Sequence, residues 1–342
     1  MLDDLASRHP LRLGVHLHRL RLARELKGPE AAARLYQPPP PGVDADRAAV
    51  LAKLARLEDE DVAGREAVLE AALAQEAFNP FWRLGVAHVK LTAYDLVSAR
   101  AEEERELGEV MTSAESFAEA LRINEEARQH AETALQQDPS FMEAHLLLGF
   151  LWVRRAGLAA TRDEKDKFRQ TAQYHYEQAK ALDPESLAAR LNLAETHLWF
   201  DAYESAGDEL RIAARLAPGV PLVWSNLGLT YYYTGELGGA VDAYRRALQL
   251  EPRNARVRAA LSDCLRRDDP ELALEELERA RADAGDDRAL LAEIAFKMGA
   301  IQEHERLYKD AVLNYQRHID LDGADAAKAR SRIRHIYEHA YE

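Results

Sequence analysis

Apolar residues recur every three or four positions along most of this chain, and strand-like alternation is never sustained. Such spacing places the apolar side chains on one face of an α-helix. From Asp44, a good helix N-cap, the pattern predicts a helix that ends near Glu60, and then a second helix from about Val62 to Ala77. Leu, Ala, Glu and Arg dominate the sequence, so the expected fold class is all-α.

The clearest order lies between Leu187 and Asn254, where one 34-residue pattern occurs twice. The second copy holds Pro221, Trp224, Leu227, Gly228, Tyr231, Gly235, Ala240, Tyr244, Ala247 and Pro252. At the matching places the first copy holds Arg190, Leu193, Ala194, His197, Asp201, Ala206, Leu210, Ala213 and Pro218. Proline is tolerated in the first turn of a helix but not in its interior, so Pro184, Pro218 and Pro252 mark the boundaries of helix hairpins.

Residue size within the pattern follows a packing logic. Gly228 and Ala240 are small where two antiparallel helices approach closely, and Tyr244 is large enough to fill the gap to the next pair. One hairpin cannot bury its apolar face alone, so successive copies must stack. The pattern resembles the tetratricopeptide repeat, with its Trp-x2-Leu-Gly-x2-Tyr, Ala-x3-Phe and Pro positions. The resemblance implies a right-handed α-solenoid of stacked antiparallel helix pairs, a superhelix that ends in a C-terminal capping helix. It also implies that the protein functions by binding.

Repeat quality and composition divide the chain into four parts. Residues 1–43 form a basic and apolar segment that ends in a Pro-rich spacer, residues 44–138 hold divergent long hairpins, 139–322 the tetratricopeptide-like repeats and 323–342 the capping helix. A stiff spacer at Pro38–Pro41 would let the N-terminal segment be placed separately. That segment could cap the solenoid or lie in its groove, or it could dock on a partner or an anionic membrane surface.

Three local features depart from the ideal repeat. Thr112 followed by Glu115 predicts a capping box at the start of the second helix of a long pair. A highly charged insertion around residues 161–169 predicts an extended hairpin, and a weaker unit predicts a lengthened turn around residues 302–309.

The charge of the chain excludes some partners. The formal net charge is −14, and residues 1–43 carry 7 Lys and Arg against 4 Asp and Glu, so the rest of the chain is more acidic still. Phosphate binding needs a basic face, which argues against a nucleic-acid partner. With Cys264 as the single cysteine, no intrachain disulfide can form. The N-terminus lacks a signal-peptide core and no apolar stretch reaches the ~20 residues of a membrane span, so we expect a cytoplasmic protein without one.

The sequence offers little for catalysis. His335, Glu338 and His339 match the His-x-x-Glu-His order of some zinc proteases, but the sequence ends at Glu342 without a third ligand, which favours a solvated helix end. His16 and His18 form an equally weak pair, and there is no phosphate-binding loop or nucleophile elbow. We therefore expect no enzyme, no cofactor and no metal.

The resemblance also implies where a partner binds. In this family the first helix of each pair lines a concave groove, and the corresponding residues here are Phe150, Asn192, Glu195, Leu198, Trp199, Asn226, Leu229, Tyr232, Tyr233, Arg266 and Arg267. Asn192 and Asn226 occupy the same place in consecutive repeats, and an Asn amide can both donate to and accept from a peptide unit. Exposed aromatic residues commonly mark interaction sites. The implied function is a non-catalytic scaffold or adaptor that binds a peptide or helix of a partner protein.

Other interpretations remain open on the sequence. The asparagines could be ordinary helix-surface residues, and the aromatic residues could pack between repeats. The protein could also be a regulator that senses a small peptide or other ligand. A third alternative is a structural scaffold that forms homo-oligomers when the N-terminal segment fills a neighbour's groove.

The groove positions give a first testable prediction. Co-chaperones of this family clamp a C-terminal carboxylate with Lys, Asn and Arg side chains on three successive repeats. Here those places hold Leu146, Phe150, Leu222 and Asn226 in one frame and Leu191, Glu195, Arg256 and Ala260 in the next, so neither frame builds the clamp. We expect chaperone tail peptides not to bind in a titration followed by fluorescence anisotropy, and tight binding that depends on Asn226 would contradict this.

Overall fold

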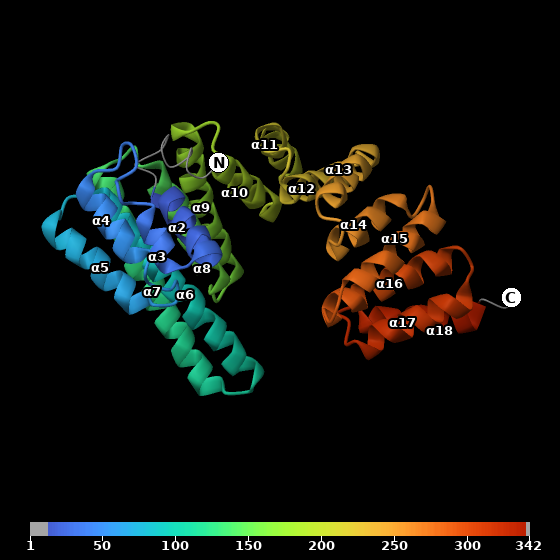
Figure 1. The fold of residues 1–342 in the computed structure, drawn as a ribbon. Coiled ribbons are helices and arrows are strands. Elements are labelled where there is room, and N and C mark those ends of the chain that lie inside the picture. The colour runs from blue at the N-terminus through green and yellow to red at the C-terminus, as the bar shows by residue number, and fades with distance from the viewer. Residues whose placement is uncertain (1–12, 340–342) are drawn as a thin grey trace. The chain divides into compact units, whose positions relative to one another are not determined.

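The computed structural model describes residues 13–339, which form α-helices joined by short turns and contain no strand (Figure 1). The chain forms two compact units, Met1–Ala189 and Arg190–Glu342. The helices of the first unit are α2 (Leu13–Lys27), α3 (Pro29–Arg34), α4 (Ala45–Leu54), α5 (Val62–Gln75), α6 (Pro80–Glu106), α7 (Val110–Gln137), α8 (Met142–Gly157) and α9 (Arg162–Leu182).

Helix α10 (Leu187–Trp199) contains the boundary between the units. The second unit continues with α11 (Tyr203–Leu216), α12 (Pro221–Tyr233), α13 (Leu237–Leu250), α14 (Ala255–Leu265), α15 (Pro270–Asp283), α16 (Arg288–His304), α17 (Tyr308–Asp320) and α18 (Ala326–His339). Within each unit consecutive helices pair, as α6 with α7 and α12 with α13 do, and pairs pack on one another, as α7 on α8 and α13 on α14 do, which confirms the expected all-α stack of hairpins.

Side-chain caps decide where several helices begin. Asp44 caps α4 as predicted, because its Oδ1 accepts the backbone N–H of Arg47 at 2.8 Å. The capping box predicted at Thr112 is wrong, since α7 begins at Val110 and Thr112 lies within it. A capping box does occur at Thr161, where Glu164 N–H donates to Thr161 Oγ1 at 3.2 Å and opens the inserted part of α9.

The described part of the N-terminal segment belongs to the core of the first unit. Leu13 and Leu20 of α2 are buried, and His16 Nδ1 lies 2.7 Å from the hydroxyl of buried Tyr36. Arg24 forms an ion pair with Asp59 at 2.8 Å. Of the placements that the sequence left open for this segment, residues 13–36 pack on the first unit, because α2 supplies apolar side chains to its core. Residues 1–12 of the segment lie outside the described residues.

A small residue on the first helix of a pair lies against a large one on the second. A Cβ added to Gly228 would lie 2.7 Å from the ring of Tyr244, and one added to Gly149 would lie 2.3 Å from the ring of Tyr176. The same contact joins Gly299 and Tyr315. Each tyrosine ring occupies the space that a side chain on the facing helix would take. Tyr244 also joins the core formed with α14, so it fills the gap to the next pair as well.

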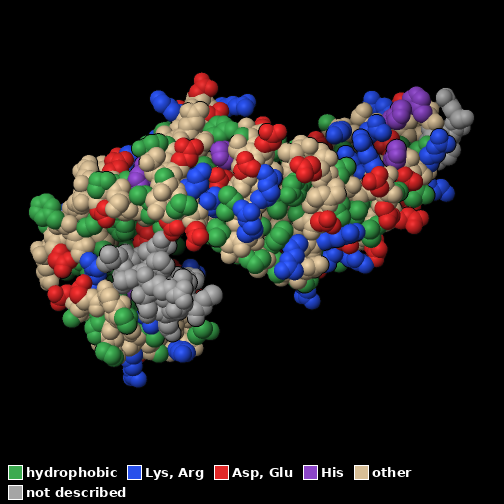
Figure 2. Space-filling view, turned by 90° about the horizontal axis from the view of Figure 1, so that it is seen from above, with side chains coloured by type: hydrophobic (Ala, Val, Ile, Leu, Met, Phe, Trp, Pro, Cys, Tyr) green, Lys and Arg blue, Asp and Glu red, His purple; other side chains and the backbone are tan. Residues whose placement is uncertain are grey.

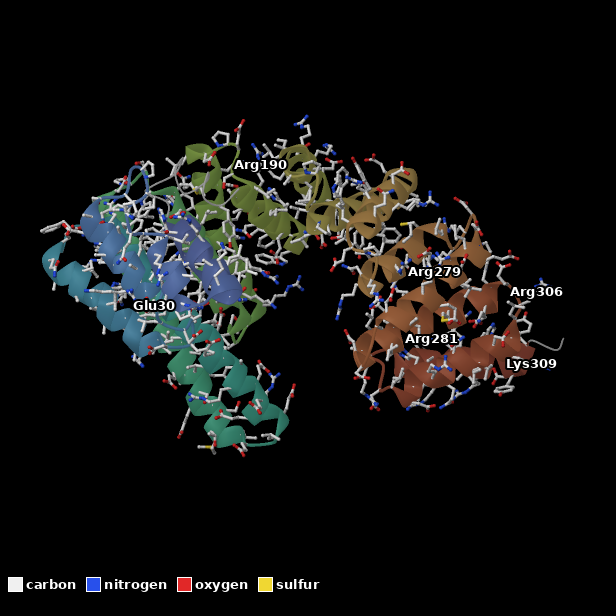
Figure 3. The ribbon with its side chains drawn as sticks, in the orientation of Figure 1. Glu30, Arg190, Arg279, Arg281, Arg306 and Lys309 are labelled. Carbon is white, nitrogen blue, oxygen red and sulfur yellow. The ribbon has the colours of Figure 1, made fainter. Side chains whose placement is uncertain are left out.

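One position of the repeat holds chemically different residues that donate equivalent hydrogen bonds. Trp224 Nε1 donates to the carbonyl oxygen of Pro218 at 2.9 Å, and 34 residues later Arg258 donates to that of Pro252 at 2.7 Å. Where this place holds arginine, the second helix supplies a carboxylate: Arg190, labelled in Figure 3, pairs with Glu209 at 2.6 Å, and Arg258 pairs with Glu276 at 2.7 Å. Both repeats therefore have a hydrogen bond to the proline carbonyl oxygen at the hairpin boundary, although the donating side chain differs.

The turn inside several hairpins needs a left-handed residue. Gly235 has φ 83°, and Asp201 and Arg306 have φ 55° and 60° at the corresponding bends. At each bend the next residue's N–H bonds five residues back, as in the bond from Glu236 to Tyr231 at 2.8 Å. The lengthened turn predicted around residues 302–309 is wrong, because α16 continues to His304 and Arg306 makes the same tight bend (Figure 3).

His88 and His175 of the first unit are held neutral by their surroundings. Burial, and to a smaller extent Arg65, lowers the pKa of His88 to about 4. Burial beside His145 and Arg128 lowers the pKa of His175 to about 4. The Nδ1 atoms of His145 and His175 lie 3.1 Å apart, so only one hydrogen can lie between them. The folded first unit therefore binds fewer protons than the unfolded chain between about pH 4 and 6.5.

The glycine contact predicts a stability change. Gly228→Ala should lower the free energy of unfolding by about 1–3 kcal/mol, because the new methyl group overlaps a buried ring that cannot move freely. Gly238→Ala, where nothing lies within 4 Å of the added Cβ, is the matched control and should leave stability unchanged or slightly raised. Urea unfolding followed by circular dichroism measures both, and equal effects would contradict the packing argument.

The histidines predict acid sensitivity. As the pH falls from 7.5 to 5, the depressed pKa of His88 should cost about 1–2 kcal/mol of unfolding free energy. In His88→Leu that loss should shrink by the same amount, because leucine does not titrate. Urea midpoints at both pH values in wild type and variant give the comparison. An unchanged pH dependence in the variant would show that His88 does not contribute.

Candidate functional site

First helices of successive pairs lie side by side in the second unit. Leu191 and Leu198 of α10 pack against a buried cluster that contains Leu227 of α12. Lys297 of α16 donates to the carbonyl oxygen of Ala259 of α14 at 3.3 Å. Helices α12 and α14 also contact each other. The predicted binding residues of this unit therefore belong to α10, α12 and the end of α14.

The predicted binding residues on α10 differ in their exposure and in their hydrogen bonding. Leu198 packs against the apolar cluster, so it serves the core as well as any surface. Trp199 is half-buried and Glu195 is exposed. The amide nitrogen Nδ2 of Asn192 is buried and has no hydrogen-bond partner within the described residues. An unpaired buried donor is costly, and rotation of the half-buried Asn192 side chain would bring this amide to the surface, where it could donate to a carbonyl oxygen of a ligand.

The α12 residues form an aromatic group with a member from α11. Tyr233 is 55% exposed and stacks on Tyr203, with ring centroids 4.5 Å apart and planes 12° apart. Tyr232 meets Tyr233 edge to face at 5.4 Å but also packs against the core of the second unit. Asn226 and Leu229 are half-buried on the same helix. The sequence missed Tyr203 because it opens a second helix, and the family pattern assigns the groove to first helices.

Tyr203 is held in place by a carboxylate. Its hydroxyl donates to Asp201 Oδ1 at 2.7 Å, in the bend with positive φ. This hydrogen bond, together with burial and the charge of Asp201, raises the pKa of Tyr203 to about 12. The ring that supports Tyr233 is therefore neutral and fixed at physiological pH.

Phe150 lies in the first unit, on α8. It is 42% exposed, and its ring meets Tyr176 edge to face at 6.2 Å. It covers the tyrosine that packs on Gly149, so part of its role is structural.

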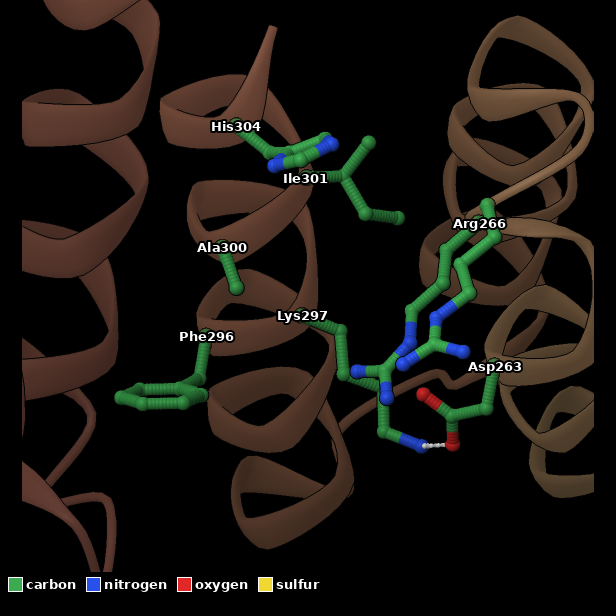
Figure 4. A pocket seen from close by; sticks show the side chains of 8 residues that line it. Asp263, Arg266, Phe296, Lys297, Ala300, Ile301 and His304 are labelled. Atoms are coloured by element: carbon green, nitrogen blue, oxygen red, sulfur yellow. Dashed lines mark hydrogen bonds and ion pairs between the residues drawn. The ribbon is translucent and has the colours of Figure 1, made fainter.

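Arg266 and Arg267 line a cavity of about 400 Å³ between α14 and α16 (Figure 4). The remaining lining residues are Asp263, Phe296, Lys297, Ala300, Ile301 and His304. Lys297 pairs with Asp263 at 2.6 Å and Glu293 at 2.9 Å. Burial disfavours the charge of Lys297, but these carboxylates outweigh it and raise its pKa. The sequence missed His304 because it fell in the stretch predicted to be a turn.

A second hollow lies between α16 and α18. It shares Ala300 and His304 with the first and adds Arg306, Arg332, His335 and His339. Near the C-terminal end, Figure 2 shows Lys, Arg and His side chains close together. Arg332 is engaged by Glu303 at 2.6 and 2.8 Å, and Glu303 also accepts from Tyr315. Within this acidic chain, positive charge thus gathers locally.

The other candidate groups have structural surroundings. Within residues 13–339, no three His, Cys, Asp or Glu side chains are placed to hold a metal ion. The rings of His335 and His339 lie 4.5 Å apart on exposed α18. Cys264 is buried, and burial raises its pKa to about 11, which disfavours the reactive thiolate. None of the described helices is both long and apolar enough to cross a membrane.

Comparison with known proteins identifies the repeat. Residues 221–254 match the tetratricopeptide repeat model, and they coincide with the α12 and α13 pair. No curated protein matches the chain.

Several solved structures are similar. YrrB, described as a tetratricopeptide repeat protein with an unusual peptide-binding site, is 17% identical, covering 56% of this chain and 91% of that one, with a TM-score of 0.42. A thermophilic tetratricopeptide repeat protein of Thermus thermophilus, TTC0263, is 17% identical, covering 73% and 98%, with a TM-score of 0.42. MamA of Desulfovibrio magneticus is 19% identical, covering 54% and 97%, with a TM-score of 0.43.

Proposed function

Because the chain is a tetratricopeptide repeat protein, we propose that it is a non-catalytic scaffold whose second unit binds an extended peptide or a helix of a partner protein. The partner segment lies along α10 and α12. Asn192, Glu195, Trp199 and Asn226 supply polar and aromatic contacts, Leu198 and Leu229 supply apolar ones, and Tyr232 and Tyr233 supply the anchor. Arg266 and Arg267 are the outermost residues of the proposed site, and Phe150, in the first unit, is not part of it.

The observation that carries this proposal is that two binding groups on neighbouring helices are not used by the fold. Asn192 Nδ2 is buried without an acceptor in the described part of the chain, and Tyr233 is more than half exposed on a stacked support. A backbone carbonyl of a bound peptide would satisfy the first, and an apolar or aromatic side chain would cover the second. Neither contact depends on more than one residue of the ligand, so the surface would suit an extended segment.

The support of Tyr233 should favour its use as an anchor. Its ring is held on one side by Tyr203 and on its edge by Tyr232, so little rotamer freedom is lost on binding. Buried aromatic anchors at interfaces contribute about 2 kcal/mol or more, and a neutral hydrogen bond contributes about 1 kcal/mol.

The test begins with affinity capture of partners from a native lysate and identification by mass spectrometry. The shortest binding segment of a captured protein is then titrated against purified variants by calorimetry. Tyr233→Ala should weaken binding by about 30-fold, and Asn192→Ala or Asn226→Ala by about fivefold each.

The control is Asp242→Ala with Arg246→Ala, two exposed positions on the second helix α13. This double variant should bind like the wild type. Undiminished binding by an Asn192→Ala, Asn226→Ala, Tyr233→Ala triple variant with intact helicity would show that the partner binds elsewhere.

A further inference from the structure

The hairpin of α6 and α7 ends in an exposed apolar tip. These helices contain 27 and 28 residues, about 40 Å each, and they project beyond the neighbouring helices of the first unit (Figure 1). At the tip, Leu107, Val110 and Met111 are 70%, 71% and 75% exposed. Single exposed apolar residues are ordinary, but three large ones within five positions form a patch that water covers poorly.

The same tip is strongly acidic. Residues 102–111 contain five glutamates and one arginine. Arg105 pairs with Glu102 of its own helix, and the nearby Arg100 pairs with Glu119 at 2.7 Å. Glu103, Glu106 and Glu109 are exposed and have no ion pair within the described residues. The tip therefore offers an apolar contact surrounded by unneutralised carboxylates.

The tip is also rigid enough to dock without reorganisation. Ser113 Oγ donates to the carbonyl oxygen of Ala101 at 2.9 Å, and both residues are buried between the helices. Gly108 has φ 79°, and Glu109 N–H closes the turn on the carbonyl oxygen of Glu104 at 2.9 Å. Further down, Tyr94, Ala120 and Ile123 form a small core of their own. Such a preformed element loses little conformational entropy on binding.

The cavity between α14 and α16 has the opposite properties. Its apolar part is formed by Phe296, Ala300 and Ile301. The side chains of Arg266 and Arg267 make no hydrogen bond or ion pair within residues 13–339, although Asp263 lies in the same cavity and is taken by Lys297. Two unpaired guanidiniums beside an apolar surface favour an apolar ligand that carries carboxylates.

We propose that the α6–α7 tip of one copy docks into the α14–α16 cavity of a second copy. Leu107 and Met111 cover Phe296 and Ile301, while the tip glutamates pair with Arg266 and Arg267. A second copy is favoured as the occupant because this chain itself carries both complementary surfaces. The contact is heterologous, so one contact leaves a free cavity on one copy and a free tip on the other, and these two surfaces bind further copies or close on each other as concentration rises.

This contact differs from oligomerisation through the N-terminal segment, whose buried residues Leu13 and Leu20 already belong to the core of its own unit. A tip entering one cavity buries less than a standard interface, so the association is weak and reversible. It also depends on ionic strength, because charge pairs at the rim are screened by salt.

Sedimentation velocity of the full chain from 1 to 200 µM tests the proposal. In 50 mM NaCl the weight-average sedimentation coefficient should rise with concentration, and in 500 mM NaCl that rise should fall at least fivefold. A tip variant, Leu107→Ser with Met111→Ser, and a cavity variant, Arg266→Glu with Arg267→Glu, should each associate at least tenfold more weakly. Phe78→Ser, which replaces another exposed apolar residue of the first unit, is the control and should associate like wild type.

Mixing the two variants gives the decisive result. The tip variant keeps a working cavity and the cavity variant keeps a working tip, so an equimolar mixture should form a 1:1 dimer that does not grow further. A wild type that stays monomeric at 200 µM, association that survives in both variants, or a mixture without dimer would each overturn the proposal. Tyr233→Ala and Asn226→Ala should leave assembly unchanged, so failure of the peptide site and failure of this contact are separable.

Discussion

The close approach of two helices over a glycine is the contact on which each clear hairpin depends. Gly228 leaves room for the ring of Tyr244, and Gly149 and Gly299 do the same for their own tyrosines. Where the first helix carries Ala194 instead, the second carries the smaller Leu210, and both lie in one buried cluster. The sizes of the two facing side chains are therefore balanced within each helix pair rather than fixed at each position, as close packing requires. This explains how divergent repeats can keep one backbone geometry.

With the helix pairs fixed in this way, the surface positions are free to vary. Trp224 and Arg258 occupy one place in the repeat and both donate to a boundary proline carbonyl, although one is aromatic and the other charged. The family pattern includes the tryptophan at this position but not the arginine. The carboxylate of Glu276 then becomes necessary, because a mostly buried guanidinium needs a partner. The proposed binding residues on this scaffold are side chains that packing leaves at least partly exposed.

The proposed surfaces follow from that division of labour. On α10 and α12, an unpaired amide and a supported tyrosine suit an extended peptide, which offers carbonyl oxygens and side chains at regular intervals. In the two units of the chain, an acidic apolar tip and a basic apolar cavity have complementary chemistry. In such a scaffold the partner lies along α10 and α12, and only Arg266 and Arg267 are shared with the contact to another copy.

Local chemistry in the sequence determined the helices, the 34-residue hairpins and the cap at Asp44, because helix period and proline position act over a few residues. It also placed Asn192 and Asn226 on first helices. Only the tertiary structure decided that Leu198 and Tyr232 contribute to the core, that α2 completes the first unit, and that Tyr203 supports Tyr233. It also decided that Arg266 faces an apolar cavity with Lys297 already neutralised. These outcomes depend on contacts between residues far apart in the chain, and the spacing of one helix does not contain that information.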